Sequence, residues 1–207
     1  MNTRRTPDGQ QRRRELCDAA IQLLAELGAK GVSHPRVDRQ AGVPDGSTSY
    51  YFRTRSALVH AVAERVAELD LADLRSVTEG DAATSRQAAV SRLAAVVTKS
   101  LTGDGLNRTR ARIELLLQAS RDPAISEVFH TNSQTYLRLH RELAEQSQPV
   151  NANASDIDDQ VLLTVMFISG LMLGAAAGNQ PVIKRDRLEL LLGQIGNRTS
   201  ERPRTTD

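Results

Sequence analysis

The stretch AGVPDGSTSYYF, residues 41–52, decides the fold. Ala41 is small enough for two helices to approach closely, and Gly42 accepts the positive φ that ends a helix. Val43 fills the angle between the helices, and Asp45 is expected to cap a new helix over residues 46–52. The sequence therefore predicts a helix-turn-helix across residues 33–52.

The second helix of this motif carries side chains that suit a DNA groove. Three small hydroxyl residues precede two tyrosines, and Arg53 and Arg55 follow. These are groups that bind phosphates and base edges. Residues 1–65 hold 11 Lys and Arg against 7 Asp and Glu, whereas the remaining residues hold 16 against 18. Positive charge at this end favours double-stranded DNA as the partner, although a solvated basic tail explains the first arginines equally well.

Apolar residues at helical spacing predict further helices on both sides of this stretch. Upstream, we expect a helix over residues 13–27 and a short one that Ser33 caps. Downstream, Ser56 is expected to cap a long helix that continues to Gly80. The later helices are predicted over residues 88–101, 108–120, 123–148, 161–177 and 187–195, with a turn at 103–105. Because no segment has the period of a strand, the predicted class is all-α.

Residues 13–65 resemble the DNA-binding head of the TetR/AcrR transcriptional regulators. The matching positions are Ala20, Gly28, Ser33, Val37, Ala41, Gly42, Val43, Gly46, Tyr51, Phe52, Arg55 and Leu58. The resemblance implies a homodimer in which each subunit has an N-terminal three-helix head and a C-terminal helical domain for ligand binding and dimerisation. The expected division is a basic disordered tail at 1–12, a helix-turn-helix domain at 13–55, a connecting helix at 56–80, an effector-binding and dimerisation domain at 81–198 and a disordered tail at 199–207.

The resemblance also implies which residues contact DNA. Ser33, Tyr51 and Arg55 match positions that contact phosphates, and residues 47–50 match the part of the helix that enters the major groove. Tyr51 alternatively packs in the core, as we expect of Phe52, and Arg36 alternatively lies on a solvated face. The expected DNA-binding residues are Ser33, Arg36, Asp45, Gly46, Ser47, Thr48, Ser49, Tyr50, Tyr51 and Arg55.

Three positions depart from the family's pattern. Asp38 stands where the family usually has Ala, so its side chain is expected to reach solvent or to cap a neighbour. Thr48 replaces Leu or Ile, and Ser49 replaces Tyr. These hydroxyls change which phosphates or bases are within reach. The operator sequence therefore does not transfer from relatives, whereas DNA binding does.

Polar residues on an otherwise apolar stripe mark the expected ligand pocket. The helix over residues 123–148 carries Asn132 and His140 beside Phe129 and Tyr136, and Arg112 on an earlier helix suits an anionic effector. The alternative places Asn132 and His140 at a solvated edge and Arg112 in salt bridges. The expected pocket residues are Arg112, Phe129, Asn132, Tyr136 and His140.

Residues 161–183 contain no charged residue, and Gly170 and Gly174 have the spacing at which two helices touch. A membrane span needs roughly 20 mostly apolar residues, and polar residues shorten this segment. A helix capped by Asp156 or Ser155, and covered by its own subunit and a second copy, is the better account, and a purely internal helix is the alternative. The expected dimer contacts are Phe167, Gly170, Leu171, Gly174, Leu188 and Leu191.

Enzymatic, metal-binding and cofactor-binding motifs are missing from the sequence. It has no nucleophile elbow, glycine-rich phosphate loop or helical His pair for zinc, so we expect no enzyme, cofactor or metal. A single cysteine, Cys17, fits a reducing cytoplasm. The leading prediction is a ligand-released, homodimeric repressor with a small-molecule effector and a palindromic operator. The alternative is a helical adaptor or protein-interaction module whose degenerate head no longer binds DNA, supported by Asp38, Ser49 and the modest charge.

Overall fold

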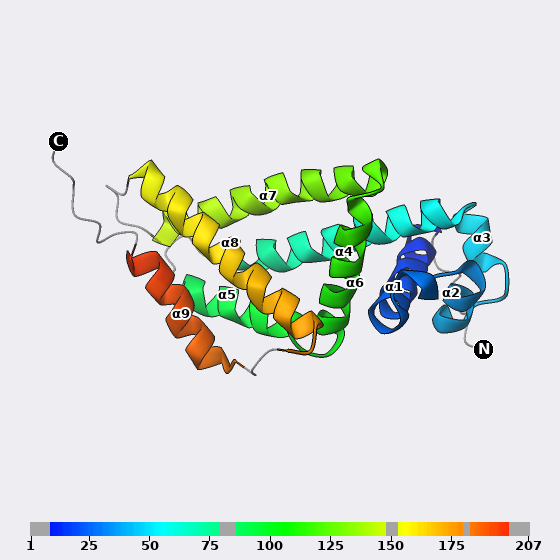
Figure 1. The fold of residues 1–207 in the computed structure, drawn as a ribbon, viewed down its shortest axis with the longest axis horizontal. Coiled ribbons are helices and arrows are strands. Elements are labelled where there is room, and N and C mark those ends of the chain that lie inside the picture. The colour runs from blue at the N-terminus through cyan, green and yellow to red at the C-terminus, as the bar shows by residue number, and fades with distance from the viewer. Residues whose placement is uncertain (1–8, 79–85, 148–152, 180–182, 199–207) are drawn as a thin grey trace, which may run out of the picture. The chain divides into compact units, whose positions relative to one another are not determined.

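The computed structural model describes residues 9–78, 86–147, 153–179 and 183–198 (Figure 1). These residues form nine α-helices, one 3₁₀ turn and no strand, which confirms the all-α class. Residues 9–12, predicted to lie in a disordered tail, are helical. Residues 1–8 and the predicted tail at 199–207 lie outside the described residues, as does the expected end of the long helix at Gly80.

The internal contacts of the chain divide it into two compact units, and several helices contribute residues to both. The described parts of residues 1–69 and 107–129 form what we name the head unit, and those of 70–106 and 130–207 form the body unit. The elements are α1 Gly9–Leu27, η1 Ala29–Gly31, α2 His34–Ala41, α3 Ser47–Tyr51, α4 Arg55–Thr78, α5 Arg86–Ser100, α6 Gly103–Ala119, α7 Pro123–Ser147, α8 Ala154–Ala176 and α9 Arg185–Arg198. The first turn of α6 covers residues 103–105, which the sequence assigns to a turn.

The core of the head unit joins α1, α2 and α4 to parts of α6 and α7. Leu16 and Leu24 of α1 pack with Leu58 of α4 and with Leu115 of α6, and all four are almost fully buried. Phe52, at the end of α3, is 2% exposed, which confirms its expected place in the core. Residues 107–129 therefore belong to the head unit by packing, although the sequence predicts them in the C-terminal domain.

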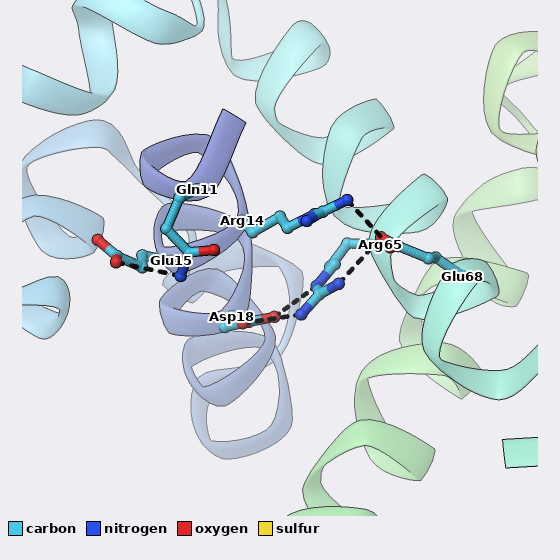
Figure 2. Close-up of polar contacts among 6 residues, drawn as sticks. All are labelled: Gln11, Arg14, Glu15, Asp18, Arg65 and Glu68. Atoms are coloured by element: carbon cyan, nitrogen blue, oxygen red, sulfur yellow. Dashed lines mark hydrogen bonds and ion pairs between the residues drawn. The ribbon is translucent and has the colours of Figure 1, made fainter. Parts of the chain in front are cut away.

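Ion pairs hold α1 against α4 (Figure 2). Arg65 lies between Asp18 and Glu68: its Nε and Nη2 donate to the Asp18 carboxylate at 2.8 and 3.2 Å, and its Nη1 donates to Glu68 at 2.9 Å. Arg14 approaches the same Glu68 at 3.6 Å. The hydrogen bonds to Asp18 outweigh the effect of burial and raise the pKa of Arg65. The first helix is thus fixed to the long helix by a bidentate contact.

The capping residue differs from the predicted one at α4 and at α8, whereas α2 has the predicted residue at its N-cap. Thr54, rather than Ser56, caps α4 by accepting the Ala57 N–H at 3.1 Å. Asn153, rather than Asp156 or Ser155, caps α8 by accepting the Ser155 N–H at 3.3 Å. Ser33 stands at the N-cap position of α2, as predicted, but its side chain makes no capping hydrogen bond.

The core of the body unit lies between α5, α7, α8 and α9. Ile168 and Met172 of α8 pack in one cluster with Leu93 of α5 and Leu188 of α9. Arg185 joins α9 to α5 by donating to the Ser91 carbonyl at 3.2 Å. By length and composition α8 could cross a membrane, with a mean hydropathy of 1.6 over its most apolar window. One face of α8 nevertheless forms part of this core, so the helix is a component of the folded body unit.

Candidate functional site

The turn between α2 and α3 has the predicted glycine geometry. Gly42 takes a left-handed conformation, φ 63° and ψ 35°, directly after the last residue of α2. The Val43 N–H returns to the Asp38 carbonyl at 3.0 Å and closes the end of the helix. Gly46 has φ 88°, which a side chain rarely adopts, and α3 starts at the next residue. The two glycines set the tight bend before α3.

Asp38 of α2, and not Asp45, caps the N-terminus of α3. Its Oδ2 accepts the Gly46 N–H at 2.8 Å, and its Oδ1 accepts both the Thr48 N–H at 2.7 Å and the Thr48 hydroxyl at 2.5 Å. Asp38 is 1% exposed and Thr48 is fully buried. The prediction that Asp45 caps the helix is therefore wrong, and of the two fates expected for Asp38 the structure shows the capping one.

The two unusual residues of the motif are partners. Asp38 and Thr48 replace a residue pair that is apolar in the pattern of the resembled family, and here they bind one another inside the head unit. Burial opposes ionisation of Asp38, but the hydrogen bonds from Thr48 and Gly46 outweigh it and lower its pKa. Because its hydroxyl is buried and already bonded, the prediction that Thr48 reads a base is wrong.

The outer face of α3 is available to a partner. Ser49 is exposed, and Tyr50, at 73%, is the most exposed of the large apolar or aromatic residues that the structure describes. Tyr51 is half-buried, and its ring meets that of Tyr50 edge to face with centroids 5.1 Å apart. Ser47 donates its hydroxyl to the Pro44 carbonyl at 2.6 Å. A surface hollow beside them is lined by Arg12, Val43, Pro44, Ser47, Tyr50 and Tyr51.

An arginine and a histidine side chain hold the C-terminal end of α3 in place. Arg13 of α1 donates to the Tyr51 carbonyl at 3.0 Å, and its guanidinium lies 4.5 Å from the centre of the Phe52 ring. A ring nitrogen of His34 in α2 donates to the Phe52 carbonyl at 2.7 Å. Sequence reasoning missed both residues, because their partners are backbone carbonyls that only the fold brings near.

Arg55 already holds part of the head unit together. Its Nε donates to the Val32 carbonyl at 3.2 Å and its Nη2 to the Ala29 carbonyl at 2.5 Å, while the side chain stays exposed. A guanidinium has five N–H donors, so a phosphate contact by Arg55 stays a prediction beside this structural role. Arg36 and Asp45 are also exposed, and Ser33 is half-buried.

A cavity lies inside the body unit, between α5, α7, α8 and α9. Its volume is about 30 Å³, the space of roughly one water molecule and far below the roughly 300 to 1,000 Å³ of drug-sized ligand sites. Of the five predicted pocket residues, only His140 lines it. The lining residues are Arg86, Ala89, Val90, Leu93, His140, Leu143, Ala144, Gln160, Val161, Thr164, Leu192 and Gly196.

The other four predicted pocket residues lie elsewhere. Phe129 is 7% exposed and packs in the head unit's core, so it does not line this cavity, and its pocket role stays a prediction. Arg112 also belongs to the head unit. Tyr136 packs against the body core with its ring centre 4.5 Å from that of His140, and Asn132 is half-buried with its Oδ1 unbonded in the described part of the chain.

Two buried nitrogen atoms at the cavity lack hydrogen-bond partners among the described residues. They are His140 Nε2, on a side chain only 2% exposed, and Arg86 Nη2. Burial lowers the pKa of His140 to about 4, so its imidazole is neutral at physiological pH. Buried polar atoms are nearly always bonded in folded proteins. Arg86 was missed because nothing in its sequence surroundings marks it as inward-facing.

The predicted dimer contacts divide between the two faces of α8 and α9. Leu171 and Leu188 are buried in their own subunit's core, at 6% and 1% exposure, so placing them in an interface is wrong. Gly170 is exposed, and Phe167, Gly174 and Leu191 are half-buried. The exposed apolar residues of α8 are Leu162, Leu163, Met166 and Leu173.

Comparison with known proteins places these features in a family. Residues 16–62 match the model described as bacterial regulatory proteins, tetR family, and residues 84–196 match the tetracyclin repressor-like C-terminal domain. The HTH-type transcriptional regulator BetI of Escherichia coli is 25% identical over 185 residues, which cover 84% of this chain and 86% of that protein.

Solved structures have the same fold. A transcriptional regulator from Rhodococcus sp. aligns with a TM-score of 0.72 at 18% identity, over 92% of this chain and 99% of its own. The multidrug binding protein EbrR, solved with ethidium, aligns with a TM-score of 0.61 at 26% identity, over 91% and 99%. With both family models matched along its length, the chain belongs to the TetR family of DNA-binding transcriptional regulators.

Proposed function

We propose that this protein is a homodimeric repressor that binds a near-palindromic operator and leaves it when a small effector binds in the body unit. The observation that carries the proposal is the outer face of α3, where Ser49 and Tyr50 are exposed on a helix whose start and end are both held by hydrogen bonds. A rigid helix with exposed polar and aromatic side chains suits the major groove. Because its proposed partner is DNA, we expect this protein to be located in the cytoplasm.

The exposed face of α8 supports a homodimer. Leu162, Met166 and Leu173 lie one turn or two apart along the helix and are each more than half exposed. Gly170 lies among them, and a side chain added there would meet nothing within 4 Å. A second copy would cover this face and present a second α3. Recognition helices in such dimers enter major grooves roughly 34 to 36 Å apart, which requires a near-palindromic site.

The cavity in the body unit supports an effector. Arg86 and His140 each bury a nitrogen atom that has no hydrogen-bond partner among the described residues, which is unfavourable, and a ligand with matching acceptors would supply those partners. EbrR, with which this chain shares its fold, was solved with ethidium, an aromatic cation. Among the described residues that line the cavity here, Arg86 is the charged one. An effector of this protein is therefore expected to carry a negative charge, unlike ethidium.

The adaptor alternative loses part of its support. Asp38, which the sequence offered as a sign of degeneration, forms three hydrogen bonds that order the reading helix. What remains for that alternative is Ser49 and the modest net charge of +2. An exposed α3 on an intact head favours DNA binding.

Selection of bound sequences from a random DNA pool with the full-length protein tests the proposal. We expect enrichment of a two-half-site sequence, and binding to it that weakens steeply with salt because counterions are released from the phosphates. The matched control is Arg138→Gln, a charge removal on an exposed position of α7 outside the head unit. Absence of any enriched sequence, together with absence of salt-dependent binding, would contradict DNA recognition and favour the adaptor.

A further inference from the structure

We propose that the cavity of the body unit binds the carboxylate group of a small aliphatic acid, with Arg86 Nη2 and His140 Nε2 as its hydrogen-bond donors. The regulatory meaning of this site rests on the proposed function above, whereas the binding itself does not. Both nitrogen atoms are buried at the cavity, and both lack partners among the described residues.

The charge of the lining selects an anion. Arg86, at the start of α5, is permanently protonated, and the described residues that line the cavity include no Asp or Glu. Arg86 is half-buried as a residue, but its Nη2 is buried without a hydrogen-bond partner among the described residues. A carboxylate is the group whose two oxygen atoms match the donors of a guanidinium. The ligand therefore supplies the missing negative charge.

A single negative charge fits better than two. His140 is neutral at physiological pH because burial lowers its pKa to about 4. In its Nε2–H tautomer the imidazole donates one hydrogen bond without adding a second positive charge. One cation and one neutral donor balance a monoanion, whereas a phosphate dianion would leave a negative charge uncompensated. The charge of the site therefore favours a carboxylate over a phosphorylated ligand.

A glycine of α9 sets the position of the guanidinium. A Cβ atom added at Gly196 would collide with Arg86 Nη2 and would lie 3.2 Å from Gln160 Nε2. The missing side chain allows the arginine to lie directly against α9. Replacing Gly196 by alanine would therefore displace the guanidinium while keeping its charge, and alanine also favours the helix.

The walls of the cavity select an aliphatic chain. Leu93 of α5, Val161 of α8 and Leu192 of α9 line it, together with other small or branched apolar residues. The present volume of about 30 Å³ has room for little more than the head group. An attached chain must therefore separate these side chains, which moves helices of the body unit relative to one another. Such a movement is how a ligand of this site would change the state of the dimer.

Calorimetric titration of the full-length protein with acetate, butyrate, hexanoate and octanoate tests the site, with hexanamide and hexanol as uncharged controls. We expect saturable binding of a carboxylate of medium length and none of the uncharged analogues. Arg86→Gln should raise the Kd by about tenfold to a hundredfold, because a charged hydrogen bond is lost. Gly196→Ala should weaken binding in the same direction without any loss of charge.

Matched variants control for general effects. Arg138→Gln and His130→Gln remove an arginine and a histidine from exposed positions of the same α7 helix and should leave the Kd unchanged. His140→Gln should weaken carboxylate binding. Circular dichroism of each unliganded variant shows whether it folds. If Arg86→Gln does not fold, Gly196→Ala provides the test of the site.

Three outcomes would overturn the proposal. They are no carboxylate binding by the unaltered protein, equal binding of carboxylates and their amides, and an unchanged Kd in Gly196→Ala and Arg86→Gln. Gel shifts with the selected operator are measured separately. Carboxylate binding without operator release would leave the site intact and contradict its effector role. Operator binding without carboxylate binding would contradict the site and leave the proposed DNA binding intact.

Discussion

At the scale of single residues, the buried pair of Asp38 and Thr48 shows how two departures from a family pattern can be one feature. The sequence marks each residue as unusual but does not connect them, because they are ten positions apart on different helices. Only the turn at Gly42 and Gly46 brings the carboxylate to the start of α3. The same contact that orders α3 removes Thr48 from the exposed face of that helix.

Replacing Asp38 tests this pairing. Asp38→Ala should lower the free energy of unfolding by about 2 to 4 kcal/mol, because two N–H groups and the Thr48 hydroxyl lose their acceptor in a buried place. Urea denaturation measures the loss. The double variant Asp38→Ala with Thr48→Leu should recover part of it by removing the buried hydroxyl. A double variant whose loss equals the sum of the two single losses would show that the residues act independently.

Tyr50 is the residue of α3 that we expect to read sequence. Tyr50→Ala should change base preference at one position of each half-site, at a cost of about 1 to 3 kcal/mol for the preferred base. Thr48→Ser retains the buried hydroxyl and serves as the control, with preference unchanged. Binding to a panel of operators with single base changes measures both. Equal losses of affinity for specific and random DNA in Tyr50→Ala would show that this side chain contacts the DNA backbone rather than a base.

His140 should make stability depend on pH. The native state resists its protonation down to about pH 4, whereas the ordinary pKa is 6.5. Between these values the unfolded state binds more protons, so the free energy of unfolding falls as the pH is lowered from about 6.5 to about 4, by up to about 3 kcal/mol. Urea denaturation across this range, compared with His140→Gln, isolates the contribution. His130→Gln is the control, and an identical pH profile in His140→Gln would show that His140 is not buried in the neutral form.

At the scale of elements, the sequence predicts where helices lie better than how they begin. Apolar periodicity located the longer helices, because that pattern reflects a buried face and is read over many residues. Caps depend on one side chain, and neighbouring residues compete: Thr54 and Ser56 flank the start of α4, and Asn153, Ser155 and Asp156 cluster at α8. For α3 the cap comes from another helix altogether, which no local rule predicts.

The contact between α1 and α4 should be a measurable part of the head unit's stability. Arg65→Gln should lower the free energy of unfolding by about 1 kcal/mol, since it removes a bidentate contact with Asp18 and a hydrogen bond to Glu68, all partly exposed to solvent. Arg14→Gln, which loses only the 3.6 Å approach to Glu68 (Figure 2), is the matched control and should cost less. If both changes cost the same, general charge rather than the bidentate geometry stabilises the contact.

At the scale of the whole molecule, the sequence establishes the helical class and the family but not the faces by which the helices pack. α8 is apolar nearly all round, so Leu171 and Leu173 look equivalent in the sequence, whereas the first is 6% and the second 57% exposed. The cavity was only partly foreseen for the same reason. His140 was identified as a polar residue on an apolar stripe, but Arg86 and Gly196 join it through packing between α5 and α9.

The exposed face of α8 gives the test of assembly. Met166, at 57% exposure, stands near the middle of this face, and Met166→Glu would place a carboxylate from each copy into a shared apolar interface. We expect a monomer in sedimentation analysis at concentrations where the unaltered protein is a dimer, with helical content preserved. Operator affinity should fall by more than tenfold, because the two heads are no longer linked. Leu137→Glu, which alters an exposed leucine of α7, controls for surface charge and should remain dimeric. A dimer unchanged by Met166→Glu would place the interface elsewhere, and an unaltered protein that is monomeric while bound to its operator would contradict the proposed dimer itself.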